Sequence, residues 1–440
     1  MRIRQAVTVA TTLVLIASPI ASAERPPDPN PADLPGAAAP SPSAATQKRS
    51  ECAEPLPLDP ADSVEAALPV RELWDLTRGA GQKVAVIDTG VAHHPRLKNL
   101  IGGGDYVTQS DGTEDCDAHG TLVAGLIAAT PSDSDGFAGI APDATILSIR
   151  QSSAAYSYTG GQSNQSVSNS KGVGTVGSLA RAIRYAADSG ATVINLSEVA
   201  CAPDMNDASL GAAVQYAAVV KDVVIVAAAG NNDVCHVAEG GQRSWESVRT
   251  IVSPAWYDEY VLTVGSVGPS GQASPFTVPG PWVDMAAPGE RVVSLDPRTD
   301  GLTNAIAGTE GQRLAINGTS FAAPLVSGTA ALIRARFPEL RARDVIALIE
   351  ATAHAPARGW DQYVGFGVVD PGAAVTAVDP AHIASPRKPG SDRADGRPIP
   401  IPDLPSETHV WGRNLALLGT ASVLGLLALG LVAAPRRKRR

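Results

Sequence analysis

Between residues 63 and 377 the chain alternates two kinds of apolar pattern, and this alternation restricts its possible folds more than any other feature of the sequence. Short apolar runs predict buried strands, and stretches with apolar residues every three or four positions predict helices. Strands that alternate with helices favour a doubly wound, mostly parallel α/β sheet with helices on both faces. The expected strands are residues 83–88, 144–150, 191–197, 223–229 and 261–267, and the expected helices are residues 121–129, 178–189, 208–221, 321–336 and 343–353.

The N-terminal region differs from this domain, which we expect to span residues 63–379. Residues 1–23 contain two arginines, then an apolar run, then Ala-Ser-Ala, a pattern typical of a cleavable secretory signal. Residues 24–62 are dense in Pro and Ala with little periodicity. We therefore expect a Pro-rich extension that lacks a core of its own.

The C-terminal region predicts a membrane anchor. Residues 415–434 are uncharged and almost wholly apolar, and about 20 helical residues span a hydrocarbon core of ~30 Å. The basic tail, residues 435–440, is expected to stay in the cytoplasm. Residues 380–414 are Pro-rich and charged, and predict a semi-rigid linker. The protein is thus expected at the cell membrane, held by one C-terminal helix, with its folded domain outside the cytoplasm.

Charge and cysteine content agree with an exported domain. The formal net charge is −9, and without the two basic residues of the signal and the five of the tail the exported part carries −16, so nucleic acid is not an expected partner. An even number of cysteines outside the cytoplasm favours two disulfides, and four cysteines allow three pairings. We favour Cys52–Cys116 and Cys201–Cys235, because Cys201 and Cys235 each follow an expected strand. Free thiols or a metal site are the less favoured alternative, since no Cys-x-x-Cys spacing or His pair supports metal ligation.

Three short segments each place one chemically active side chain beside small residues. They are Val-Ala-Val-Ile-Asp-Thr-Gly ending at Gly90, His-Gly-Thr-Leu-Val-Ala-Gly beginning at His119, and Asn-Gly-Thr-Ser-Phe-Ala-Ala-Pro around Ser320. Asp88 ends an apolar strand, where open α/β sheets collect functional residues. His119 can act as a general base near neutral pH, and Ser320 precedes an expected helix whose dipole favours developing negative charge. A lone Ser or His in such places is usually a cap or a structural residue, but the three together favour nucleophilic catalysis.

The tripeptide Asp88-Thr-Gly has a second interpretation, because aspartic proteases use it on paired carboxylates. Asp88 belongs to an α/β pattern, whereas aspartic proteases are all-β. The acidic run before His119 also suggests calcium, but its spacing is irregular. We therefore expect neither an aspartic protease nor a metal or cofactor site.

The order Asp, His, Ser resembles that of the subtilisin-like serine proteases, and differs from chymotrypsin-like and α/β-hydrolase triads. The resemblance implies a catalytic triad of Asp88, His119 and Ser320. It also implies that the side chain of Asn231 and the backbone N–H of Ser320 bind the oxyanion. The substrate-binding residues would be Ser197, Glu198 and Gly230. Glu198 departs from the usual Leu-Gly of this family, so it either disfavours acidic P1 residues or is a solvated loop charge.

The organisation of the whole chain resembles the mycosins, the membrane-anchored proteases of type VII secretion systems. This resemblance rests on the signal, the Pro-rich extension, the subtilisin-like domain with Asn-Leu-Ser-Glu, the four cysteines and the C-terminal anchor. It implies an extension that wraps the catalytic domain, polypeptide substrates among secreted proteins, and partner subunits in the secretion complex. Two functions therefore stay open: an endopeptidase, and a scaffold with secondary proteolytic activity.

Overall fold

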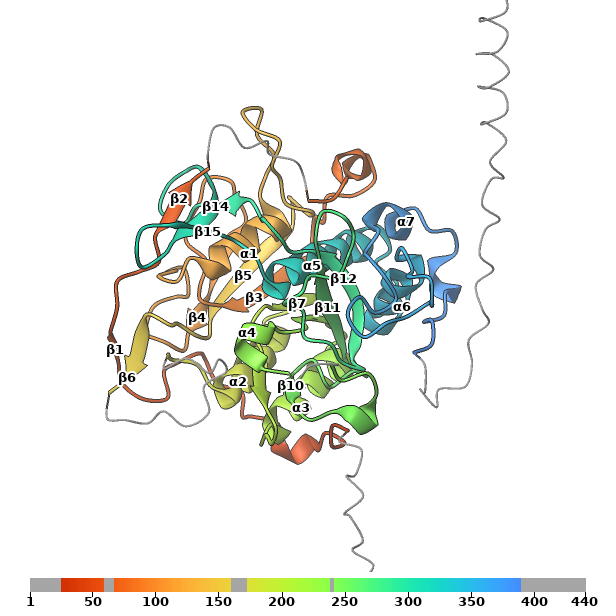
Figure 1. Ribbon diagram of the computed structural model, residues 1–440, viewed down its shortest axis with the longest axis horizontal. Coiled ribbons are helices and arrows are strands. Elements are labelled where there is room, and N and C mark those ends of the chain that lie inside the picture. The colour runs from red at the N-terminus through yellow and green to blue at the C-terminus, as the bar shows by residue number, and fades with distance from the viewer. Residues whose placement is uncertain (1–24, 59–66, 160–171, 238–240, 389–440) are drawn as a thin grey trace, which may run out of the picture. The chain divides into compact units, whose positions relative to one another are not determined.

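The computed structural model describes residues 25–58, 67–159, 172–237 and 241–388 of the 440-residue chain (Figure 1). The expected signal 1–23, transmembrane helix 415–434, basic tail 435–440 and all of the linker 380–414 beyond residue 388 lie outside these ranges. Within them, no helix is both long and apolar enough to cross a membrane.

The centre of the domain is a seven-stranded parallel sheet with strand order β12-β11-β9-β7-β3-β5-β4. Five of its strands were expected, because a parallel strand covered on both faces is a nearly continuous apolar run. The other two, β4 and β12, were missed. Three glycines interrupt the apolar run of β4, while β12 contains an Asp and ends in Pro. The strands are β3 (Lys83–Asp88), β4 (Leu100–Asp105), β5 (Thr145–Arg150), β7 (Val193–Leu196), β9 (Val224–Ala228), β11 (Val261–Val267) and β12 (Val283–Pro288).

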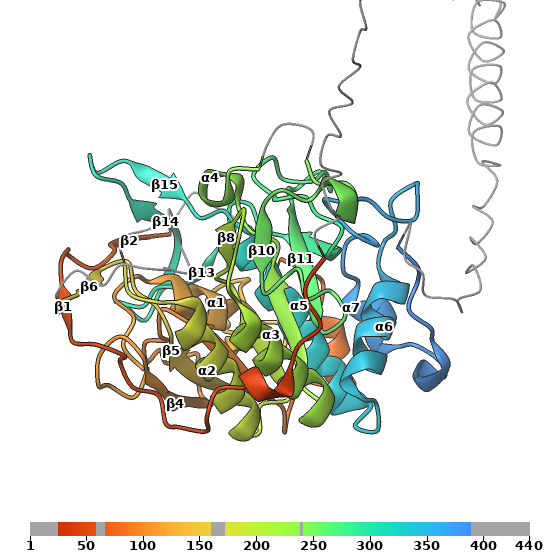
Figure 2. The same cartoon turned by 90° about the horizontal axis from the view of Figure 1, so that it is seen from below.

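Helices cover both faces of this sheet, as the alternating pattern predicts. Helices α2 and α3 pack together on one face, below the strands in Figure 1 and at the front of Figure 2, and α1 and α5 pack together on the other. Helix α5 contacts five strands of the sheet, and almost all of its residues are buried. The helices are α1 (His119–Ala128), α2 (Val176–Asp188), α3 (Ala208–Gln215, continued by a π-helical turn Tyr216–Val220), α4 (Asn232–Cys235), α5 (Thr319–Arg336), α6 (Ala342–Thr352) and α7 (Pro371–Val375).

The N-terminal extension, residues 25–58, lies along the surface of the domain and pairs with it at two places (Figure 1). Strand β1 (Thr46–Lys48) pairs antiparallel with β6 (Tyr156–Tyr158), and β2 (Pro55–Pro57) pairs with β14 (Leu302–Ala307). Strand β14 also joins β13 (Ser294–Leu295) and β15 (Arg313–Ala315) in a small sheet. Because the extension has no core of its own, these pairings to the domain hold it in place.

Two disulfides add covalent links, in the two pairs favoured above. Cys52 in the extension is joined to Cys116, just before α1. Cys201 in β8 (Ala200–Ala202), which pairs with β10 (Ile251–Ser253), is joined to Cys235 at the end of α4. The first disulfide ties the extension to the loop that leads into α1, and the second closes one rim of the sheet.

We expect the double variant Cys52→Ser/Cys116→Ser to lose about 4 kcal/mol of unfolding free energy, because this link closes a loop between cysteines 64 residues apart. Urea unfolding under oxidising conditions measures the loss. Limited proteolysis should then cut within residues 25–58, while the wild type resists. An unchanged urea midpoint and an equally protected extension would contradict the prediction.

The C-terminal end of the described chain also stays packed on the domain, beyond the expected boundary at residue 379. The Lys388 side chain is only 12% exposed, and its Nζ lies 2.6 Å from Asp284 Oδ1 and forms a second ion pair with Asp258. Asp284 belongs to β12, so this contact fixes the chain to an outer strand of the sheet. The start of the expected linker is therefore part of the folded domain.

Candidate active site

Asp88 and His119 form a direct hydrogen bond at the carboxyl edge of the sheet. Asp88 ends β3, which lies between β5 on one side and β7 on the other. The strand order reverses at β3, so this is the topological switch point of the sheet. The Asp88 side chain is fully buried, and its Oδ1 lies 2.7 Å from His119 Nδ1 and accepts the Thr89 N–H at 2.8 Å. A carboxylate only accepts, so Nδ1 is the protonated ring nitrogen and Nε2 is left to act as a base.

Two glycines allow the start of α1 to approach the end of β3. A Cβ on Gly120 would lie 2.0 Å from the Gly90 carbonyl oxygen, and a Cβ on Gly90 would lie 2.0 Å from the Glu114 carbonyl oxygen. Gly90 also has φ +100°, a conformation that favours glycine. Helix α1 begins at His119 itself, two residues earlier than expected. The small residues in both motifs therefore set the distance between Asp88 and His119.

Asp115 joins the two motifs and was not identified from the sequence as a positioning residue. Its Oδ1 accepts from Thr89 Oγ1 at 2.9 Å, and its Oδ2 accepts from the Thr121 N–H at 2.8 Å and from Thr121 Oγ1 at 2.6 Å. Desolvation raises the pKa of Asp115 to about 6, although the hydrogen bonds from Thr121 and Thr89 favour the ionised form. The acidic run suggested a cation ligand, but this carboxylate instead binds hydroxyl and amide groups on both sides of the site.

Ser320 lies in the first turn of α5, not before the helix as expected, because α5 begins at Thr319. Ser197 Oγ donates to the Ser320 carbonyl at 2.9 Å and accepts from Asn195 Nδ2 at 2.8 Å. Ser327 Oγ in turn donates to Asn195 Oδ1 at 2.8 Å. The Ser197 hydroxyl thus fixes the backbone at Ser320 from inside the protein. These bonds do not support the expected role of the Ser197 side chain in binding substrate.

Asn231 and Ser320 border the same small space. The Thr319 N–H and Thr319 Oγ1 both donate to Asn231 Oδ1 at 3.1 Å, which identifies the other end of the amide as Nδ2. A Cβ on Gly318 would lie 2.9 Å from Ser320 Oγ and 3.4 Å from Asn231 Nδ2. Because glycine leaves this position empty, a hydroxyl and an amide N–H₂ face a common point, as nucleophile and oxyanion donor require.

Gly230, the third expected substrate-binding residue, lies beside this space. Its φ is +92°, and its N–H donates to Thr319 Oγ1 at 3.2 Å. A Cβ on Gly230 would lie 3.0 Å from Cys235 Sγ and 3.4 Å from Val199 Cγ2. The Cys201–Cys235 disulfide therefore packs against Gly230.

The charges around His119 change its basicity. Burial alone would lower the pKa of His119, but the charge and hydrogen bond of Asp88, together with the charges of Glu198 and Asp115, raise it to about 9. The Phe321 ring packs against the imidazole with 4.9 Å between ring centroids. The neutral imidazole that can accept a proton therefore accumulates only as the pH rises.

Glu198 is not a solvated loop charge, which corrects one of the two alternatives above. Its Oε2 is buried and has no hydrogen-bond partner among the described residues. Desolvation and the Asp88 charge raise the pKa of Glu198 to about 7, whereas His119 and Ser152 favour the ionised form. The carboxylate thus belongs to the same electrostatic cluster as Asp88 and His119.

We expect kcat/KM for peptide hydrolysis to rise with pH up to about 9, because protonated His119 cannot accept a proton. Glu198→Gln should move this rise, the acid limb of the pH profile, to lower pH, since the substitution removes a negative charge that raises the pKa of His119. The pH profiles of the two proteins with one peptide measure the shift. An acid limb at the same pH in both would contradict the prediction.

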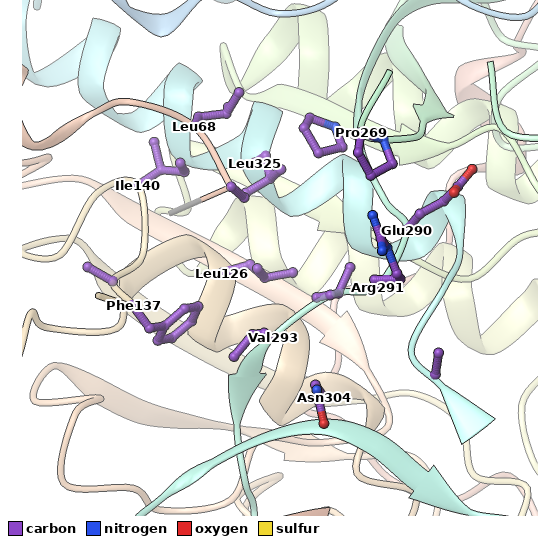
Figure 3. A pocket seen from close by; sticks show the side chains of 15 residues that line it. Leu68, Leu126, Phe137, Ile140, Pro269, Glu290, Arg291, Val293, Asn304 and Leu325 are labelled. Carbon is purple, nitrogen blue, oxygen red and sulfur yellow. The ribbon is translucent and has the colours of Figure 1, made fainter. Parts of the chain in front are cut away.

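A pocket of about 490 Å³ lies elsewhere on the domain (Figure 3). Most of its lining residues are apolar, among them Leu126 of α1, Leu325 of α5 and Phe137, and its charged lining residues are Glu290 and Arg291. None of the site residues described above lines it. In the described part of the chain, no group of three or more His, Cys, Asp or Glu side chains could hold a metal ion.

Comparison with known proteins agrees with this geometry. The model of the subtilase family matches residues 79–367. Mycosin-4 of Mycobacterium tuberculosis is 48% identical over 446 aligned residues, which cover 98% of this chain and 96% of the relative. The solved structure of MycP1, a serine protease described as an essential component of the type VII (ESX-1) secretion system, is 43% identical with a TM-score of 0.75, covering 80% of this chain and all of that one. A chain in an intact ESX-5 inner membrane complex is 40% identical with a TM-score of 0.74, covering 93% of this chain and all of that one.

The matched region contains all three motifs, the parallel sheet and the candidate site. The identity to Mycosin-4 extends over nearly the full length of both chains, so it includes the extension and the C-terminal region as well. The chain is a subtilisin-like serine protease of the subtilase family, and within that family it belongs to the mycosins.

Proposed function

We propose that Asp88, His119 and Ser320 form the catalytic triad of an endopeptidase that hydrolyses peptide bonds in secreted polypeptides. The strongest support is the 2.7 Å bond between Asp88 Oδ1 and His119 Nδ1. It fixes the tautomer in which Nε2 is free to take a proton. The space beside Gly318, bordered by Ser320 Oγ and Asn231 Nδ2, is where the scissile carbonyl would bind.

In this mechanism His119 Nε2 accepts the Ser320 hydroxyl proton as Oγ attacks the carbonyl carbon. Asp88 stabilises the imidazolium that forms. The developing oxyanion accepts hydrogen bonds from Asn231 Nδ2 and from the Ser320 N–H at the start of α5, where the helix dipole also favours negative charge. His119 then donates its proton to the leaving amine, and water hydrolyses the acyl-enzyme by the same route.

The protein is also proposed to act at the outer side of the cell membrane, as a subunit of a type VII secretion complex. Residues 1–23 would direct export, and residues 415–434 would form the single membrane anchor. The presence of a 40% identical chain in an ESX-5 inner membrane complex supports the association. Anchoring would confine the catalytic domain near the membrane, so its substrates would be the polypeptides exported beside it.

A structural role in the complex is the second candidate, and it is compatible with the first. The extension is held to the domain by two strand pairings and a disulfide, which suits a rigid subunit more than a removable inhibitor. The intact constellation of Asp88, His119, Ser320 and Asn231 has no purpose in a pure scaffold.

We expect deletion of the gene to impair export of type VII substrates, and Ser320→Ala to leave export running while abolishing processing of exported proteins. Quantitative proteomics of the culture medium measures both. If Ser320→Ala stops export as completely as deletion does, a separate structural role is wrong. If deletion leaves export untouched, the proposed place in the secretion complex is wrong.

A further inference from the structure

Three buried polar atoms without a hydrogen-bond partner among the described residues surround the Asp88–His119 pair. They are Asp88 Oδ2, Ser152 Oγ and Glu198 Oε2. Asp88 ends β3, Ser152 follows the neighbouring strand β5, and Glu198 follows β7 on the other side. The Ser152 N–H lies 3.4 Å from the Asp88 carbonyl oxygen, and the Ser152 hydroxyl is close enough to lower the pKa of Glu198. The three atoms thus lie at one edge of the sheet.

Such a cluster needs a hydrogen-bond donor. Buried polar atoms are almost always paired in folded proteins, so these three atoms call for a partner. Ser152 is only 5% exposed, so bulk solvent does not supply a partner for its hydroxyl. Asp117 lies in the same cluster, but its oxygens already accept from Ser153 Oγ, the Ala154 N–H and the Ala155 N–H. Glu198 is therefore the carboxylate that lies outside the Asp88–His119 bond and still has an unpaired oxygen.

The charge of the cluster selects the donor. Asp88, Asp117 and Glu198 bring three carboxylates together, and His119 is a cation that interacts with Asp88 and Glu198. An ammonium or guanidinium group supplies several N–H donors and a positive charge, and forms shorter and stronger bonds to a carboxylate than a neutral donor does. A basic side chain is the chemistry that fits.

The segment after β7 indicates which substrate residue would supply it. The P1 carbonyl must lie between Ser320 Oγ and Asn231 Nδ2, so the P1 side chain lies towards Gly230, which precedes Asn231. Val199 is on that side, since its Cγ2 would lie 3.4 Å from a Cβ on Gly230. The side chain of Glu198, which precedes Val199 in the chain, is expected on the other side of this segment, where its charge acts on His119. Successive side chains of an extended peptide alternate between faces, so the residue before P1, called P2, would face Glu198.

We propose that Glu198, with Ser152, forms a subsite that binds a Lys or Arg side chain at P2 of the substrate. This rests on the proposed endopeptidase function. The sequence suggested that Glu198 acts on the P1 residue, whereas this proposal assigns it to P2. The choice of substrate would then depend on a carboxylate beside the triad.

The test uses the full-length protein and a set of peptides that differ at P2 alone. Lysine, norleucine and glutamate are compared, because norleucine keeps the apolar stem of lysine without its charge. We expect kcat/KM for the lysine peptide to exceed that for the norleucine peptide by about tenfold, with the glutamate peptide slowest. Glu198→Gln should reduce the lysine-to-norleucine ratio to about one. The ratio is the readout, because loss of the Glu198 charge also acts on His119 and changes the individual rates.

Glu114→Gln is the matched control. Glu114 belongs to the same acidic run but its side chain is 64% exposed, so removing its charge should leave the ratio unchanged. Thermal unfolding confirms that each variant is folded. A ratio near one in the wild type, a ratio that Glu198→Gln does not change, or a preference for lysine at P4 in place of P2 would overturn the subsite. Failure of the wild type to cleave any peptide would overturn the endopeptidase function itself.

Discussion

Ser320→Ala is expected to lower kcat for peptide hydrolysis by about 10⁵-fold or more, because it removes the attacking oxygen while binding and oxyanion donors remain. The fold should survive. Alanine is a good helix former, and Ser320 lies in the first turn of a helix whose packing comes from its apolar residues. We therefore expect Tm to change by no more than about 3 °C. Kinetics with a peptide substrate and calorimetry measure the two quantities.

His119→Ala should lose nearly as much activity as Ser320→Ala, and the double variant should lose little more than either. Members of a triad act as a unit, so their losses do not add. If the logarithms of the losses did add, His119 and Ser320 would not share one mechanism. Residual cleavage by Ser320→Ala near the wild-type rate would contradict the serine-protease mechanism altogether.

Asn231→Ala is expected to reduce kcat by about 10²- to 10³-fold with little change in KM, the usual effect of losing one oxyanion donor. The reason is that Asn231 Nδ2 borders the space next to Ser320 Oγ, where negative charge appears in the transition state. A mainly raised KM with an unchanged kcat would mean that Asn231 binds the ground state instead.

Thr319→Val is the companion variant for this prediction. It keeps the volume of Thr319 but removes the Oγ1 bonds to Asn231 Oδ1 and from the Gly230 N–H, while the backbone bond to Asn231 remains. We expect a smaller loss of kcat than in Asn231→Ala, because the amide is less firmly oriented but still present. A larger loss in Thr319→Val would indicate that the hydroxyl itself contacts the oxyanion.

The sequence predicted those parts of the fold that leave a local pattern. Strands such as β3 and β11 are buried on both sides and therefore read as apolar runs, and their bounds agree with the expectation. Strand β4 contains three glycines, because neighbouring atoms pack too closely against it for a Cβ. No local sequence pattern reveals that packing. Its place in the sheet comes from pairing with β5, a tertiary interaction.

The candidate site shows the same division. The motifs around Asp88, His119 and Ser320 are local, and their small residues are visible in the sequence. The positioning bonds of Asp115 and Thr319 join separate segments, and Thr319 reaches Asn231 across 88 positions. No periodic pattern in the sequence predicts a hydrogen bond between residues so far apart. Glu198 was recognised as a departure, but its sequence position does not say whether its carboxylate faces P1 or His119.

The burial of α5 has a consequence for the timing of activity. Asp88 at the end of β3 and His119 at the start of α1 are 31 positions apart and emerge early, whereas the Ser320 carbonyl is bound by Ser197, 123 positions earlier. Helix α5 packs on β7, β9, β11 and β12, so it cannot dock before those strands have formed. In a chain that emerges from its N-terminus, the nucleophile therefore arrives last. Chains in which α5 has not yet docked therefore lack a complete proposed hydrolytic centre, so two such chains cannot cleave one another.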